Sequence, residues 1–130
     1  MHPARRADLI AVSLLALAAL AGILLWSSLP ETMVVHWSGG SPDSAVGKPL
    51  AVLGIPALGV ASVAFVRFAP SSMTNTPGGE NAAVLFLGVV VTWVQGIVLA
   101  WNLGWEFSVG LAVVPILVLA GLLVLYARMG

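Results

Sequence analysis

Residues 9–29 read LIAVSLLALAALAGILLWSSL, a run without a single charged side chain. A helix needs about 20 mostly apolar residues to cross the hydrocarbon core of a bilayer, so this run is long enough to span one. Similar apolar runs follow at 49–68, 82–101 and 108–127. Because lipid offers no hydrogen-bond partner to backbone amides and carbonyls, each run is expected to be an α-helix. The sequence therefore predicts an all-α membrane protein, a bundle of four transmembrane helices.

The composition supports a single membrane domain over residues 1–130. Hydrophobic residues make up 60% of the chain and charged residues 8%, with a mean hydropathy of +1.08. Soluble domains carry about 25% charged residues, so this chain belongs in a bilayer. The formal net charge is zero, which does not suggest binding to nucleic acid. The absence of cysteine excludes disulfides, thiolate metal sites and a thiol nucleophile.

The basic residues predict the orientation in the cell membrane. Four of the five lie at the same ends of the predicted spans, namely Arg5, Arg6, Arg67 and Arg128. Lys48 is the fifth and lies on the other side. The positive-inside rule then places both termini in the cytoplasm, with the connection at 30–48 outside. The first apolar run is longer than that of a usual secretory signal, so we expect a multi-pass protein that retains its first helix.

Helix 82–101 carries a row of small residues at every fourth position. The small-residue row consists of Gly88, Thr92, Gly96, Ala100 and Gly104. Small residues at this spacing let two helix backbones approach closely, and Gln95 beside the row is able to hydrogen-bond across helices. The spacing fits either packing within the bundle or the face of a homodimer, and Gly96→Leu is expected to disrupt that packing.

Two prolines interrupt the predicted spans. Pro56 lies inside helix 49–68 and Pro115 inside helix 108–127. Proline removes one backbone hydrogen bond and kinks a helix, so we expect neighbouring groups or waters to satisfy the freed carbonyls.

Ionisable side chains are absent from the middle of every predicted span. Proton relays, ion pathways and intramembrane proteases need such groups at depth. The sequence therefore argues against a pump, a coupled transporter or an intramembrane hydrolase. We predict a non-enzymatic protein without catalytic residues and without a cofactor.

Polar residues gather instead in the outer loop between the first two helices. This loop holds Glu31, His36, Asp43 and Lys48, and Glu106 of the second outer connection is placed to join them. Glycine and proline in its middle favour tight turns, and the stretch 34–37 has the composition of a short extended segment. We therefore expect a structured loop in which His36, Asp43 and Lys48 converge above the bundle.

His36 admits three interpretations. It is a metal ligand if Asp43 and Glu106 complete the site, but one histidine without cysteine is a weak zinc signature, and no metal is predicted. It is a catalytic base only if a nucleophile lies nearby, and the sequence shows none. The third interpretation is that His36 orients the loop or a bound ligand through hydrogen bonds. Asp43 and Lys48 also fit a simple exposed ion pair that closes the loop.

The outer loop carries an ordered motif that marks a family. The motif comprises Leu29-Pro30, His36-Trp37, Gly40, Pro42-Asp43 and Lys48, with Pro56 in the following helix. Over about residues 10–60 this order and spacing resembles the N-terminal domain of SdpI-type membrane proteins, also called domain of unknown function 1648. The resemblance implies a ligand-binding or motif role for Pro30, His36, Gly40, Asp43 and Lys48.

The best-described member of that family is a bacterial immunity protein. It protects its producer from a secreted peptide toxin and also sequesters a transcriptional repressor at the membrane. The resemblance thus implies an immunity- or receptor-like protein that works in the lipid bilayer with a peptide ligand, an envelope component or a membrane protein partner. Longer members carry further C-terminal helices with an Asn/Gly/Arg motif that this sequence lacks, so repressor sequestration is not expected.

Two other functions fit the sequence. The chain is also compatible with a small subunit that packs against a larger membrane complex through helix 82–101. A third alternative is a metal-dependent membrane enzyme or transport accessory that uses His36, Asp43 and Glu106.

Overall fold

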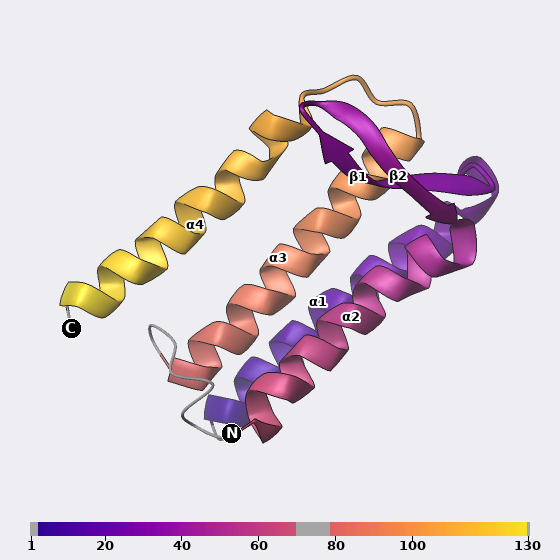
Figure 1. Cartoon of the computed structure of the whole chain (residues 1–130). Helices are drawn as coiled ribbons and strands as arrows, with labels where there is room; N and C mark the ends of the chain where they lie inside the picture. Colours follow the sequence, from indigo (N-terminus) through magenta and orange to yellow (C-terminus); the bar gives the residue numbers. More distant parts are fainter. Residues whose placement is uncertain (1–2, 70–78, 130) are drawn as a thin grey trace.

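Long helices and one β-hairpin make up the chain (Figure 1). The structure is a computed structural model that describes residues 3–69 and 79–129. Its elements are α1 (Pro3–Leu24), the short 3-10 helix η1 (Trp26–Ser28), β1 (Thr32–Ser38), β2 (Ser41–Gly47), α2 (Lys48–Phe68), α3 (Gly79–Asn102) and α4 (Val109–Met129). Within these ranges four helices are long and apolar enough to cross a membrane, which confirms the predicted multi-pass helical protein. Most of the predicted inner connection at 69–81 lies outside the described residues.

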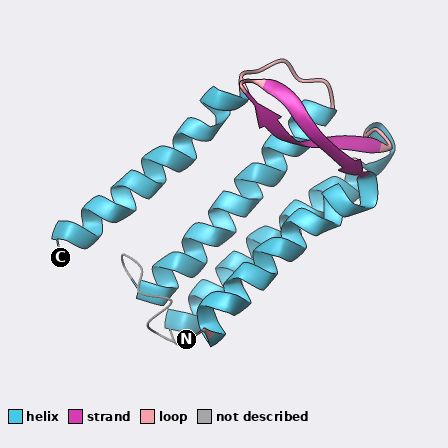
Figure 2. Cartoon of the chain, in the orientation of Figure 1, coloured by secondary structure: helices cyan, strands magenta, loops and turns pink. Residues whose placement is uncertain are grey.

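The strands lie at one end of the helices, and the two chain ends lie at the other (Figure 2). We call these the hairpin end and the terminal end. The first helix stops at Leu24, earlier than the predicted boundary at residue 29. Leu29 has an extended backbone, with φ −92° and ψ 147°, because it precedes Pro30 and proline disfavours the helical conformation in the residue before it.

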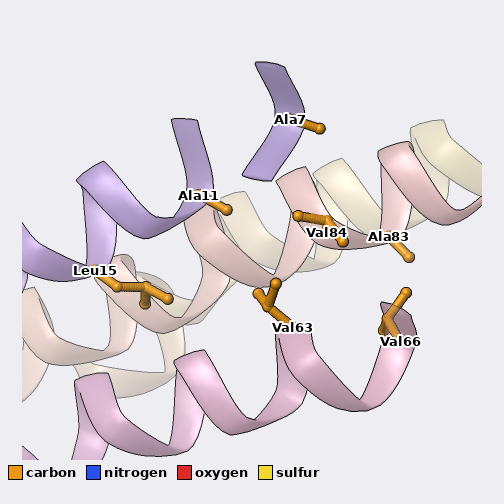
Figure 3. Packing of buried hydrophobic residues seen from close by; sticks show 7 residues of the cluster. All are labelled: Ala7, Ala11, Leu15, Val63, Val66, Ala83 and Val84. Carbon is orange, nitrogen blue, oxygen red and sulfur yellow. The ribbon is translucent and has the colours of Figure 1, made fainter. Parts of the chain in front are cut away.

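Helices α1, α2 and α3 pack against one another and form the core. In the half nearer the terminal end, small and branched side chains from all three helices meet (Figure 3); they are Ala7, Ala11, Leu15, Val63, Val66, Ala83 and Val84. The small side chains on α1 allow a close approach of α3. A Cβ added at Gly88 would lie 2.9 Å from the Cα of Ala11.

The small-residue row is not one continuous contact within the chain, so packing inside the bundle does not account for all of its members. Gly88 is buried against α1, but a Cβ at Gly96 would meet nothing within 4 Å. Gly104 lies beyond the end of α3 with φ 93°, and its N–H donates to the carbonyl of Trp101 at 3.0 Å. Trp105 N–H donates to the carbonyl of Ala100 at 3.1 Å, so the two bonds form a Schellman cap in which glycine is favoured. Three members of the row thus have different roles. Gly88 packs against α1, Gly96 lies in open space, and Gly104 belongs to the cap that ends α3.

A buried glutamine ties the three core helices together. Gln95 is 1% exposed, and its Nε2 donates to the carbonyls of Ala18 on α1 and Val52 on α2 at 3.3 and 3.0 Å. Val52 lies four residues before Pro56, so its carbonyl is the one that loses its helical partner. Gln95 replaces that partner from a neighbouring helix, as the sequence led us to expect for the freed carbonyls of the proline helices.

An arginine ties the same helices together at the terminal end. Arg67 Nε donates to Asp8 at 2.8 Å and Nη2 to Asn81 at 2.9 Å, while Nη1 lies 3.4 Å from Glu80. Its side chain is 15% exposed. Arg67 on α2 thus binds acidic and amide groups of both α1 and α3.

Helix α4 lies apart from this core, alongside α3 (Figure 1). None of the residues in its most apolar window is buried. A hydrogen bond of 2.7 Å joins Trp93 Nε1 of α3 to the carbonyl of Ala112 on α4. The protein therefore consists of a packed three-helix core with a hairpin and a peripheral fourth span that has few contacts with that core.

Candidate functional site

The hairpin lies across the hairpin end of α1–α3 (Figure 1). Gly39 and Gly40 join its strands with φ values of 57° and 84°, the left-handed pair that a type I′ turn requires. Along β1, Met33 is fully buried, and Val35 and Trp37 pack on the same cluster. Side chains alternate across a strand, so this pattern turns one face of the hairpin toward the helices and the other toward solvent.

His36 and Asp43 form a pair on the solvent face. Nδ1 of His36 lies 3.0 Å from Oδ2 of Asp43, and the hydroxyl of Ser38 donates to the same oxygen at 3.0 Å. The side chains of His36 and Asp43 are 64% and 46% exposed. The pair is therefore accessible to a ligand and contributes little to the core.

The register of the hairpin brings these two side chains together. Val34 pairs with Ala45 and Trp37 pairs with Pro42, and either pairing, continued along the strands, places His36 opposite Asp43. Side chains that lie opposite each other in an antiparallel pair share a face and are close enough to interact. The ladder is locally irregular, because His36 pairs with Ser44 and leaves Val35 and Asp43 as bulges. The contact between His36 and Asp43 therefore follows from the overall register of the two strands.

Asn102, which the sequence analysis did not single out, holds the hairpin on α3. Its Oδ1 accepts the N–H of Val34, and its Nδ2 donates to the carbonyl of Val34, both at 2.9 Å. The same Nδ2 donates to the carbonyl of Val98 at 2.8 Å. The side chain therefore pairs with β1 as a neighbouring strand would. A lone polar residue near the end of an apolar helix was the available sequence signal.

Aromatic rings extend this contact to the connection between α3 and α4. The rings of Trp37 and Trp101 meet edge to face at 5.7 Å, and those of Trp101 and Phe107 at 5.8 Å. Such pairs contribute roughly 0.5–1.5 kcal/mol beyond the burial of their area. The hairpin, the end of α3 and the following connection therefore form one platform.

Lys48 is separate from the exposed pair and lies buried at the base of the hairpin. It is 6% exposed, and its Nζ donates to the carbonyl of Trp26 at 2.9 Å and lies 5.3 Å from the centre of that ring. The same carbonyl also accepts the backbone N–H of Leu29 at 3.2 Å, so the ammonium group is a second donor to the first residue of η1. Its backbone N–H donates to the carbonyl of Glu31 at 2.8 Å. Lys48 therefore joins the start of α2 to the end of α1.

The predicted convergence of three loop residues is thus realised for two of them. His36 and Asp43 meet, while Lys48 binds Trp26, so no ion pair between Asp43 and Lys48 closes the loop. Gly40 forms the turn, and Pro30 stands where the chain leaves the helix. The motif therefore has one exposed polar pair, and its other members shape the backbone that presents it.

The predicted metal alternative finds no support in this geometry. Across residues 3–69 and 79–129, no three His, Cys, Asp or Glu side chains come together as a metal site would require. Glu106 is exposed and forms no hydrogen bond or ion pair with His36 or Asp43.

The hairpin falls inside a segment that known proteins share. Residues 13–60, from α1 through the hairpin into α2, match the family described as a domain of unknown function (DUF1648). The chain is also similar to the immunity protein SdpI of Bacillus subtilis (strain 168), with 29% identity over 111 residues. That similarity covers 82% of this chain and 52% of the relative. The chain therefore resembles SdpI-type membrane proteins.

The chain spans about half the length of the curated relative that it matches. No solved structure matches it. The matched family segment contains the motif residues that the sequence resemblance named, Pro30, His36, Gly40, Asp43 and Lys48. The resemblance that the motif indicated is therefore confirmed.

Proposed function

We propose that this chain is a non-enzymatic immunity-type protein of the cell membrane. Its hairpin end faces outward and meets a secreted peptide or another envelope component. The observation that carries the proposal is the exposed His36–Asp43 pair, presented by a hairpin that lies wholly within the matched family segment. Similarity to an immunity protein over 82% of the chain supports the class of function.

The charges of the terminal end support this orientation. Arg5, Arg6 and Arg128 are exposed there, and Arg67 lies at the same end of α2. Cytoplasmic segments of membrane proteins carry an excess of lysine and arginine. The ammonium of Lys48, at the hairpin end, is buried and bonded. Both chain ends accordingly lie in the cytoplasm, and the hairpin lies outside.

Recognition is assigned to the exposed pair because its neighbours already have structural roles. Lys48 donates to the carbonyl of Trp26 in η1, and Asn102 fixes β1 on α3. Removing either side chain takes hydrogen bonds away from backbone groups in a partly buried place, which destabilises the fold. His36 and Asp43 bond to each other and to Ser38 in solvent, where an ion pair contributes about 0–1 kcal/mol. Their loss should therefore change the surface far more than the stability.

The test is protection of Bacillus subtilis cells that lack their own SdpI, grown in co-culture with wild-type cells. The unaltered chain should protect, and the double variant His36→Ala, Asp43→Ala should not. Ser44→Ala is the matched control, because Ser44 is exposed in the same hairpin opposite His36. Membrane levels and thermal unfolding in detergent should be the same for all three proteins. Full protection by the double variant would refute the site, and none by the unaltered chain would refute the immunity function.

A packing subunit of a larger membrane complex is the second candidate function. The observation that favours it is α4, which has no buried residue in its most apolar window, together with the open position at Gly96. Purification in a mild detergent followed by mass spectrometry separates the two: a stoichiometric membrane partner supports the subunit, and its absence supports the immunity proposal. A homodimer through the same face stays a prediction that this experiment also measures.

A further inference from the structure

An apolar hollow lies on α3 beneath the connection to α4. Its volume is about 290 Å³, near the lower limit for pockets that bind small ligands. Its lining includes Trp93, Gly96, Ala100, Trp105, Glu106 and Phe107. The hollow shares Phe107 with the platform that carries the His36–Asp43 pair.

The shape of the hollow has identifiable causes. Gly96 and Ala100 have almost no side chain, so the surface of α3 is low at these positions, and a Cβ at Gly96 would meet nothing within 4 Å. The indole of Trp93 is fixed by its hydrogen bond of 2.7 Å to the carbonyl of Ala112. Trp105 is 66% exposed at the rim. The hollow therefore has a floor of small residues. The indole of Trp93 is held in place beside it, and the indole of Trp105 is exposed at its rim.

One charged side chain lines the hollow, and it selects the occupant. Glu106 is exposed and has no hydrogen bond or ion pair with any described residue. Glu31 and Asp43 are also exposed at the hairpin end, whereas Lys48, the basic residue of this end, is buried and bonded. A carboxylate attracts a cationic group and repels an anionic one, most strongly where water is partly excluded.

We propose that this hollow binds the apolar segment of a basic amphipathic peptide, with Glu106 pairing with a lysine or arginine of that peptide. The proposal rests on the proposed function and names the chemistry of its peptide partner. Anionic phospholipids fit less well, because their net negative headgroup would face Glu106. A second copy also fits less well, because a two-fold interface sets the same patch of each copy against the other, and the basic residue of this end, Lys48, is buried and cannot pair with Glu106.

Binding is measured on the full-length protein in phosphatidylcholine nanodiscs. The probe is a short helical peptide of leucine and lysine that carries a fluorescein, and the reference is empty nanodiscs. Gly96→Leu fills the floor of the hollow and should weaken binding by about tenfold or more, as expected for a central contact. Glu106→Gln should weaken it by about twofold to fivefold, as expected for an exposed ion pair. The peptide with glutamate in place of every lysine should not bind.

Gly121→Leu is the matched control, because Gly121 on α4 also has free space around it and does not line the hollow. It should bind the probe as the unaltered protein does, and all variants should unfold at similar temperatures. Wild-type affinity in Gly96→Leu, or equal binding of the glutamate peptide, would overturn the proposal. So would a dimer that Gly96→Leu converts to a monomer, because it would assign the hollow to a second copy.

Failure here is distinct from failure of the proposed function. If the Leu/Lys peptide does not bind in the hollow while the chain still protects cells, this site is refuted and the immunity function stands. If the peptide binds in the hollow and the chain never protects, the immunity function is refuted and the site stands.

Discussion

At the scale of single residues, two glycines on the same helix should respond to alanine with opposite signs. Gly88→Ala places a methyl group 2.9 Å from the Cα of Ala11, so the helices must separate. We expect a loss of about 1–3 kcal/mol in the free energy of unfolding, as for other overpacked sites. Gly96→Ala enters open space and removes a flexible residue from a helix, which should stabilise by about 0.5–1 kcal/mol.

Thermal unfolding of both variants in one detergent measures the difference. Equal melting temperatures for Gly88→Ala and the unaltered protein would show that α1 and α3 do not approach closely at this point. A lower melting temperature for Gly96→Ala would show that this position is packed in the protein, in agreement with the original interpretation of the row.

Sequence periodicity alone does not separate these glycines. The period of four places Gly88 and Gly96 on one helix face, yet α1 covers only the first. Likewise, the amide of Gln95 was recognised as a cross-helix donor, but its partner Val52 became identifiable only when α2 lay beside α3. The residue types indicated which interactions each side chain is able to make. Which residues actually meet depends on how the helices are placed, and a local sequence pattern does not encode that placement.

At the scale of elements, the attachment of the hairpin to α3 depends on one amide. Asn102→Leu removes three hydrogen bonds and leaves both backbone groups of Val34 without that partner. We expect the free energy of unfolding to fall by about 1–3 kcal/mol, because partly buried backbone groups lose their hydrogen-bond partner. Hydrogen exchange at Val34 should accelerate, while exchange in the middle of α1 and α2 stays unchanged.

Asn81→Leu is the matched control at the opposite end of α3. It removes the bond from Arg67 at the terminal end and should leave the exchange of β1 unaltered. Unchanged exchange at Val34 in Asn102→Leu would contradict the assigned role of the amide.

The hairpin was only partly predictable. Glycines 39 and 40 and the composition of residues 34–37 pointed to a turn and an extended segment, because both signals are local. The bulge at Asp43 and the bonds from Asn102 to Val34 were not visible, since they depend on strand register and on residues 68 positions apart in the sequence. Lys48 was expected beside Asp43 because the two are close in sequence, but the hairpin places it at the other end of β2.

At the scale of the whole molecule, the four spans were predictable and their arrangement was not. Hydropathy is a property of each segment, so the span boundaries follow from composition alone, apart from the early end of α1 before Pro30. How closely α4 packs against the other helices depends on how well the shapes of their surfaces fit together. All four spans are apolar around their whole circumference, so hydrophobicity does not distinguish a core helix from a peripheral one in lipid.

The central claim is that the hairpin lies outside the cell and both chain ends lie inside. The chain has no native cysteine, so one introduced cysteine reports a single position. A membrane-impermeant maleimide applied to intact cells should label Ser41→Cys, which stands at the tip of the hairpin. The same reagent should label Asn75→Cys, in the connection between α2 and α3, only after the cells are permeabilised. Labelling of both positions in intact cells, or of Asn75→Cys alone, would contradict the account.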